Sequence, residues 1–184
     1  MKETRKTRYT RMTLQDSLIE LMKEKPIAKI TIKELCEKAD INRSTFYAHY
    51  TDQFHLLRVI EDETLLWLKD ALVTVMSKTD KSGIIPVLEE ICQYVVENSR
   101  HLRVLMSEQG DIDFQKELFA LIYQQDSKLF SNLPENGNEM HKDAFIFVVS
   151  GSVGLMQHWL KNGFYKSARE MAETIYDLAF LKPE

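Results

Sequence analysis

The scarcity of glycine and proline is the feature that most restricts what this chain can fold into. Its 184 residues include only six glycines and four prolines, while 44% of the residues are hydrophobic. A β-rich fold of this length needs many tight turns, and such turns use these two residues heavily. The composition therefore predicts an all-α fold with long helices, and the length allows one or two domains around a substantial core.

Apolar spacing and capping residues indicate where the helices begin and end. A stripe of leucines four and three residues apart predicts the first helix, which ends before Pro26. Thr31 is followed three residues later by Glu34, the spacing of a capping box that starts a second helix. The expected helices cover 10–24, a short segment from Thr31, a short segment after Asn42, and then 53–77, 83–98, 100–108, 112–131, 139–162 and 166–181.

Charge is distributed unevenly along the chain, whose formal net charge is −4. Residues 1–52 hold 11 Lys and Arg against 8 Asp and Glu, whereas residues 53–184 hold 13 against 20. We call residues 1–52 the basic head and residues 53–184 the acidic body. An excess of basic residues in the head indicates that it has an anionic partner. We expect the basic tip to follow a DNA backbone or enter a minor groove as a flexible arm. The tip contains Lys2, Arg5, Lys6, Arg8 and Arg11.

The stretch ADINRSTFYAHYTD, residues 39–52, concentrates polar and aromatic side chains around the short third helix. Phe46 and Tyr50 lie four residues apart, and we expect both to point inward with Ile41. Arg43 and Tyr47 share the opposite face, with Ser44 beside them. Two short helices joined by a tight turn after a supporting helix form a helix-turn-helix, although a small bundle with an inert polar surface has the same periodicity.

The outward face has the chemistry that DNA recognition needs. Arg43 in the first turn can donate two hydrogen bonds to guanine O6 and N7. Ser44 and the Tyr47 hydroxyl can reach bases or nearby phosphates, while Thr45 and His49 suit phosphate oxygens. The sequence therefore predicts double-stranded DNA as the partner.

A more specific resemblance covers residues 30–57, ITIKELCEKADINRSTFYAHYTDQFHLL, which is similar to the signature of the TetR family of bacterial transcriptional regulators. The I-T-x-x-x-L-x-x-x-A opening, the NRSTFY block, Tyr50 and the pair Leu56-Leu57 carry the resemblance. It implies an all-α chain with a helix-turn-helix DNA-binding domain over 1–52 and a helical ligand-binding and dimerisation domain over 53–184. It also implies a homodimer on a palindromic operator, with helices 139–162 and 166–181 in the dimer seam. The implied DNA-binding residues are Thr31, Asn42, Arg43, Ser44, Thr45, Tyr47, His49 and Gln53.

Two positions depart from the family pattern. Asp40 stands where the turn usually has glycine, and aspartate tolerates the left-handed backbone that such a turn needs. Gln53 stands where a lysine often meets a phosphate, so we expect weaker salt-dependent anchoring at that point.

The acidic body gives less specific signals. SGSVGLMQHWLKNGF, residues 150–164, resembles the branch of the family that contains the dihydroxyacetone kinase operon activator. The family implies a small-molecule effector, and aromatic or Met residues at helical spacing are more often ordinary core than ligand contacts. The candidate pocket residues are Trp67, His101, Met106, Phe114, Phe119, Tyr123, Phe147 and His158.

Several other classes of protein are disfavoured. No catalytic or nucleotide-binding motif is present, so we expect no enzyme activity, no cofactor and no metal. Cys36 and Cys92 are far apart and are expected to be buried, reduced thiols. The stretch 144–160 is too short and too polar for a membrane span, and the start of the chain lacks a signal peptide, so we expect a cytoplasmic protein. Repression is the family default, and a co-activator that works through a protein partner is the alternative.

Overall fold

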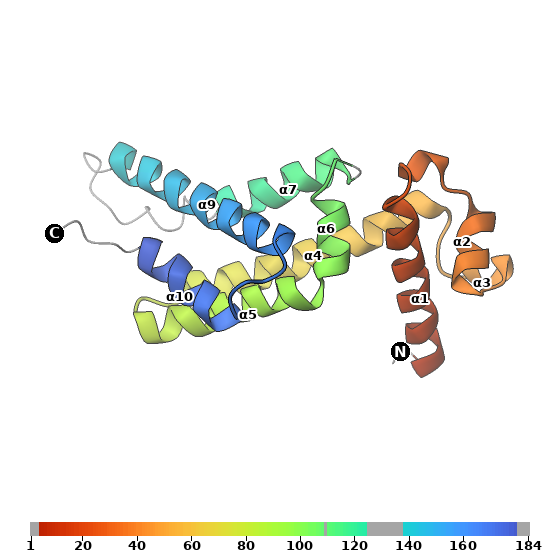
Figure 1. The fold of residues 1–184 in the computed structure, drawn as a ribbon, viewed down its shortest axis with the longest axis horizontal. Helices are drawn as coiled ribbons and strands as arrows, with labels where there is room; N and C mark the ends of the chain where they lie inside the picture. The colour runs from red at the N-terminus through yellow and green to blue at the C-terminus, as the bar shows by residue number, and fades with distance from the viewer. Residues whose placement is uncertain (1–3, 109, 125–137, 180–184) are drawn as a thin grey trace. The chain divides into compact units, whose positions relative to one another are not determined.

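The computed structural model describes residues 4–108, 110–124 and 138–179, and all regular structure in these ranges is helical. This confirms the all-α prediction. Figure 1 shows the order of the helices along the chain. The helices are α1 (Arg5–Met22), α2 (Ile32–Ala39), α3 (Arg43–Tyr47), α4 (Gln53–Met76), α5 (Lys81–Glu97), α6 (Ser99–Leu105), α7 (Ile112–Tyr123), α9 (Asn138–Lys161) and α10 (Ala168–Ala179).

The chain packs into two compact units. Unit 1 comprises residues 1–64 and 100–115, and unit 2 comprises residues 65–99 and 116–184. Because α4 runs from Gln53 to Met76, one helix contributes residues to both units. The functional division at residue 52 stays a prediction.

Unit 1 is held together by apolar side chains from its first four helices. Leu18 of α1, Leu35 of α2, Phe46 of α3 and Leu56 of α4 are all fully buried. Figure 1 shows α1 beside α2, with α3 following directly. Each fully buried side chain of this size stabilises the fold by roughly 1.5–3 kcal/mol relative to exposure. The helix-turn-helix is therefore a packed unit that presents α3 at its surface.

Helix α6 lies in unit 1 from Arg100 onward, and polar contacts join it to α1. Arg100 pairs with Glu20 at 2.8 Å, and His101 Nε2 lies 3.0 Å from an oxygen of Asp16. Lys23 also donates to Glu20, and these two cations lower the pKa of the Glu20 carboxyl to about 2. Glu20 and Arg100 are 80 residues apart in the sequence, so this ion pair joins two distant segments of the chain.

The first helix is longer than predicted. It begins at Arg5, because the Thr4 side chain accepts a hydrogen bond from the backbone N–H of Thr7 and so caps the helix. The expectation that the basic tip is a flexible arm is therefore wrong from Arg5 onward. A short 3-10 helix, Ile27–Lys29, was not predicted and follows Pro26.

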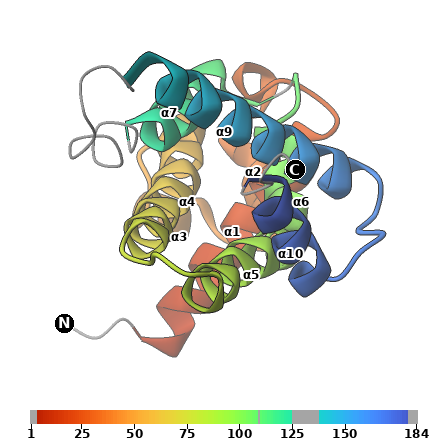
Figure 2. The same cartoon turned by 90° about the vertical axis from the view of Figure 1, so that its left-hand side faces the viewer.

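Unit 2 is built around α10, which packs on α5 (Figure 2). Trp159 of α9, Met171 of α10 and Cys92 of α5 are fully buried in one apolar cluster. The Trp159 indole N–H donates to the carbonyl of Lys166, so this buried polar atom is satisfied. Two ion pairs cross between α10 and α5 at the edge of the cluster: Lys81 with Asp177, and Arg169 with Glu89.

The turn between α9 and α10 uses left-handed backbone at two successive residues. Gly163 has φ 79°, and Phe164 has φ 60°. A phenylalanine rarely adopts this conformation, and here its ring packs edge-on against Trp159 with centroids 4.8 Å apart. Packing on the buried indole thus offsets the backbone cost and fixes how α10 returns toward α5.

The remaining helix predictions differ from the structure mainly at their ends. The expected helix 112–131 is present over Ile112–Tyr123, and residues 125–131 lie outside the described residues, as do 180 and 181. Both cysteines are buried and unbonded to one another, as predicted, and burial raises the pKa of the Cys92 thiol to about 12. None of the helices in the described ranges is long and apolar enough to cross a membrane.

Candidate DNA-binding interface

The turn between α2 and α3 has the geometry that the sequence predicted for Asp40. This residue lies in the left-handed region with φ 52° and ψ 46°. The next residue, Ile41, donates its backbone N–H to the carbonyl of Cys36 at 3.0 Å, which closes the end of α2. Aspartate therefore performs the role of the glycine that is usual at this point.

The two faces of α3 are divided as expected. Phe46 is fully buried, and Tyr50 just after the helix is 3% exposed. Their rings lie 5.8 Å apart between centroids. Tyr47 is 58% exposed, and Arg43 and Ser44 are exposed beside it. The buried pair anchors the helix, so the three outward side chains project from a fixed support.

The N-terminus of α2 carries a capping box that also engages Thr31. The Thr31 hydroxyl accepts from the backbone N–H of Glu34 at 3.2 Å, and the Glu34 carboxylate accepts from the backbone N–H of Thr31 at 2.9 Å. Hydrogen bonds from Lys25 and then from Thr31 lower the pKa of Glu34 to about 2. Thr31 is exposed, but its hydroxyl and its backbone N–H are both engaged in this box, so its contact with a phosphate stays a prediction.

The other predicted phosphate contacts lie at or after α3. Asn42 is exposed at the N-cap of α3 and makes no side-chain capping bond. Thr45, His49 and Gln53 are half-buried. All of them belong to one stretch of 12 residues, 42–53, within unit 1.

The sequence predicts Thr51 and Asp52 as the cap of α4, but the part that His55 plays in this cap was not predicted. Asp52 Oδ1 accepts from the backbone N–H of His55 at 2.8 Å, and His55 Nδ1 accepts from the backbone N–H of Thr51 at 3.2 Å. The His55 ring also meets the edge of Tyr50 at 5.7 Å. The Asp at the cap was a recognisable signal, but the return bond from His55 has no established sequence signature. Phe54 beside it is 50% exposed, which the apolar pattern did not predict.

Three candidate pocket residues lie in unit 1. Phe114 is fully buried, Met106 is half-buried, and His101 contacts Asp16 of α1. These positions place His101 in a polar contact between two helices.

The other five candidates lie in unit 2. Trp67 of α4 stacks on Tyr94 of α5 with 3.8 Å between ring centroids. The Tyr123 hydroxyl lies 2.9 Å from that of Ser150 and joins α7 to α9. Phe119 is half-buried, whereas Phe147 is 78% exposed and His158 is exposed beside Asn162 and Tyr165.

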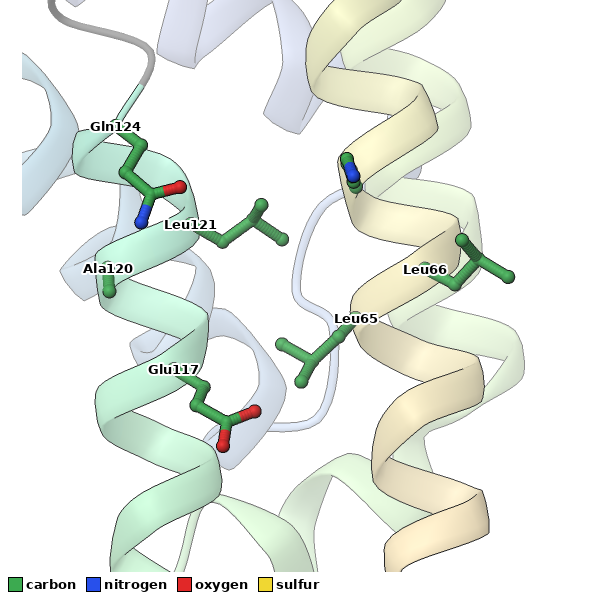
Figure 3. A pocket seen from close by; sticks show the side chains of 7 residues that line it. Leu65, Leu66, Glu117, Ala120, Leu121 and Gln124 are labelled. Atoms are coloured by element: carbon green, nitrogen blue, oxygen red, sulfur yellow. The ribbon is translucent and has the colours of Figure 1, made fainter.

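A groove of about 370 Å³ lies in unit 2 between α4 and α7. In Figure 3, Leu65 of α4 and Leu121 of α7 point toward each other across it, and Glu117 points into it from α7. None of the eight candidate pocket residues lines this groove, so their role in ligand binding stays a prediction. The lining residues are Leu65, Leu66, Lys69, Glu117, Ala120, Leu121 and Gln124.

Comparison with known proteins decides the family. A TetR-type family model, described as "Transcriptional regulator C-terminal region", matches residues 84–180, which is more than half of the chain. The chain belongs to the TetR family of transcriptional regulators. It is therefore a transcriptional regulator of this family, and the resemblance found in the sequence is confirmed.

The sequence relative reported for this chain is distant. The uncharacterised HTH-type transcriptional regulator YxbF of Bacillus subtilis is 23% identical over 177 residues, which cover 92% of this chain and 44% of the relative. The chain thus spans less than half the length of that curated relative.

Solved structures show the same fold at low identity. The fatty acid degradation regulator FadR from Bacillus halodurans has a TM-score of 0.67 at 9% identity, with both chains fully covered. The dihydroxyacetone kinase operon activator DhaS has a TM-score of 0.59 at 16% identity, covering 92% of this chain and 93% of its own. These likenesses show a shared fold and leave the effector open.

Proposed function

We propose that this TetR-family protein is a ligand-responsive repressor that binds a palindromic operator as a homodimer. Residues 1–52 bind DNA, and residues 53–184 bind the effector and form the dimer. The observation that carries the proposal is the outward face of α3, where Arg43, Ser44 and Tyr47 are exposed above a fully buried Phe46.

The outward face suits the major groove, into which the second helix of a helix-turn-helix inserts. The Arg43 guanidinium presents a planar pair of donors that fits guanine O6 and N7. The Ser44 and Tyr47 hydroxyls can donate or accept, so they suit either a base edge or a phosphate. Arg43 forms no ion pair among the described residues, which leaves its donors available.

Phosphate contacts flank these base contacts. Thr45, His49 and Gln53 follow or border α3, while Asn42 begins it and Thr31 begins α2. Such contacts fix the register of the protein on the duplex and carry no sequence information themselves. Because Gln53 has no charge, its contact contributes little to the salt dependence of binding.

Dimerisation through α9 and α10 completes the proposal. Gly151 and Gly154 are exposed on α9, and a Cβ added at either would meet nothing within 4 Å. Their small size is therefore not required by packing within the monomer, but it would let a helix of a second copy approach closely. Two heads must then meet successive major grooves, about 34–36 Å apart.

The groove between α4 and α7 is the effector site that we favour. Its volume of about 370 Å³ falls within the range typical of small-molecule sites. Leu65, Leu66 and Leu121 supply apolar walls, and Lys69 and Glu117 supply one charge of each sign. We infer an effector with an apolar body and a polar group.

The test is binding of the purified protein to the DNA upstream of its own gene, followed by fluorescence anisotropy with random DNA as competitor. A sequence-specific repressor binds this DNA at least ~10³-fold more tightly than random DNA. Equal affinity for both would contradict autoregulation by direct binding, and a pull-down from the native host would then test for a co-activator partner.

A further inference from the structure

The first two turns of α1 project from unit 1 without being packed. Residues 4–9 include no buried position, and Thr10 is the first buried residue of the helix. Tyr9 is 72% exposed. The Thr4 cap nonetheless holds this segment helical, so its residues occupy defined places on the surface of α1.

Three cations on these turns lack a carboxylate partner within the part of the chain that the structure describes. They are Arg5, Lys6 and Arg8, all exposed. Many other cations of unit 1 are neutralised by a nearby carboxylate. These pairs are Arg11 with Glu63, Lys23 and Arg100 with Glu20, Lys25 with Glu34, Lys33 with Glu37, and Arg58 with Asp62.

The cations also stand where a helix favours the opposite charge. The N-terminal end of a helix carries a partial positive charge, so basic residues there lower its stability and anions raise it. The first turn of α1 contains no acidic residue to offset this. Binding of an anion beside Arg5 and Arg8 would relieve both the mutual repulsion of the cations and the unfavourable dipole interaction.

We propose that this basic start of α1 is a second DNA contact, which binds the phosphate backbone outside the segment that α3 recognises. The proposal rests on the proposed function, since it assumes that unit 1 binds duplex DNA. Arg5 and Arg8 lie three residues apart and so share one side of the helix, about 4.5 Å apart along its axis. Their long side chains can reach neighbouring phosphates of one strand, and the exposed Tyr9 hydroxyl can donate to a third oxygen.

Duplex DNA fits this surface better than a membrane does. Tyr9 and Met12 are the large exposed hydrophobic residues among the described residues of α1, and a helix that lies in a bilayer needs a continuous apolar face. Gln53 carries no positive charge at a position where a lysine would meet a phosphate. The cations at the start of α1 supply positive charge to the DNA-binding surface in its place.

Salt dependence measures the contact directly and does not require a known operator. The probe is a random-sequence 24-base-pair duplex, titrated between 50 and 200 mM salt with wild type and with the double variant Arg5→Gln, Arg8→Gln. Each lost phosphate contact lowers the slope of log affinity against log salt by about 0.9. The double variant should therefore have a slope lower by about 1.8, so its affinity falls roughly tenfold less across this salt range.

The matched control is Lys78→Gln, Lys161→Gln, which removes two exposed cations from unit 2. Its slope should equal that of wild type. If both double variants change the slope equally, net charge alone is responsible and the contact does not exist. If wild type shows no affinity for any duplex, the proposed function fails instead, so the two failures are distinguishable.

A charge reversal separates binding from folding. Arg5→Glu places an acid where the helix dipole favours it, so the midpoint of thermal unfolding should stay level or rise. Affinity for the duplex should fall more than in Arg5→Gln alone. Equal affinity for wild type and Arg5→Glu would overturn the proposal.

Discussion

Adjacent residues on α3 have opposite roles, and this contrast can be tested with two alanine variants. Phe46→Ala removes a fully buried ring and should cost about 3–5 kcal/mol of unfolding free energy, measured by urea denaturation. Tyr47→Ala removes a ring that is 58% exposed and should change stability by about 0.5 kcal/mol or less, while abolishing specific DNA binding. Equal destabilisation by both variants would show that the inward and outward faces are reversed.

Because of Glu34, we expect the unfolding free energy of unit 1 to depend on pH in the acid range. Its pKa is about 2 in the folded chain against 4.5 for an unperturbed carboxyl, so the unfolded state binds more protons between these values. The stabilisation is complete above about pH 5 and is lost as pH falls toward 2. We expect Glu34→Gln to flatten the decline of the urea midpoint over this range. Glu24→Gln, which removes an exposed carboxylate of the same unit, should keep the wild-type decline.

Individual residues were predictable where their partners are close in sequence. The capping box of Thr31 and Glu34, the left-handed Asp40 and the inward Phe46 all follow from spacing within four residues. His101 was predicted as a polar residue of the ligand pocket, yet it contacts Asp16, which is 85 residues away in the sequence. No local pattern indicates such a partner, because it depends on how α6 packs against α1.

At the scale of helices, the structure explains why α9 tolerates glycine. The open space around Gly151 and Gly154 predicts that Gly151→Leu, Gly154→Leu leaves the monomer folded, because leucine is a better helix former by roughly 0.8 kcal/mol per position. The same change should block close approach of a second copy. Sedimentation velocity should therefore show a monomer with wild-type helix content, and an unchanged dimer would exclude this face from the seam.

Gly110 provides the opposite control. A Cβ at this position would lie 2.1 Å from the carbonyl oxygen of Leu105. Only a movement of the backbone could relieve this steric clash. Gly110→Ala should lower the thermal midpoint without a specific effect on the dimer. The sequence separates the two kinds of glycine by position, since Gly110 falls between the expected helices 100–108 and 112–131, whereas Gly151 and Gly154 lie within 139–162.

Helix ends were less predictable than helix identities, for local reasons. The first helix starts at Arg5 because Thr4 caps it, although the leucine stripe begins only at Leu14. Helix α5 begins at Lys81, two residues before its predicted start, and it contains Pro86 as the predicted range 83–98 implied. Apolar periodicity indicates the packed part of a helix, whereas an exposed turn such as 5–9 depends on capping alone.

At the scale of the whole molecule, the two units were harder to predict than their contents. The sequence places a functional boundary at residue 52, whereas by packing the first unit extends to residue 64 and includes 100–115. Helix periodicity gives no information on this, because residues 100–115 join unit 1 through tertiary contacts such as Arg100 with Glu20. The groove residues of α4 and α7 escaped prediction for the same reason, since they are far apart in sequence.

Mixed dimers test the proposal that two heads act together on one operator. Arg43→Ala should lose about 1–3 kcal/mol of base discrimination at each half-site while its dimer seam stays intact. Added in excess to wild type, it forms mixed dimers that present one competent head. Because a single head makes half of the specific contacts, such dimers should release the upstream DNA, as measured by anisotropy at constant wild-type concentration.

The control is the triple variant Arg43→Ala, Gly151→Leu, Gly154→Leu, which cannot exchange subunits and should have no effect. Interference by both variants would mean that Arg43→Ala competes for DNA, and interference by neither would mean that each head binds alone.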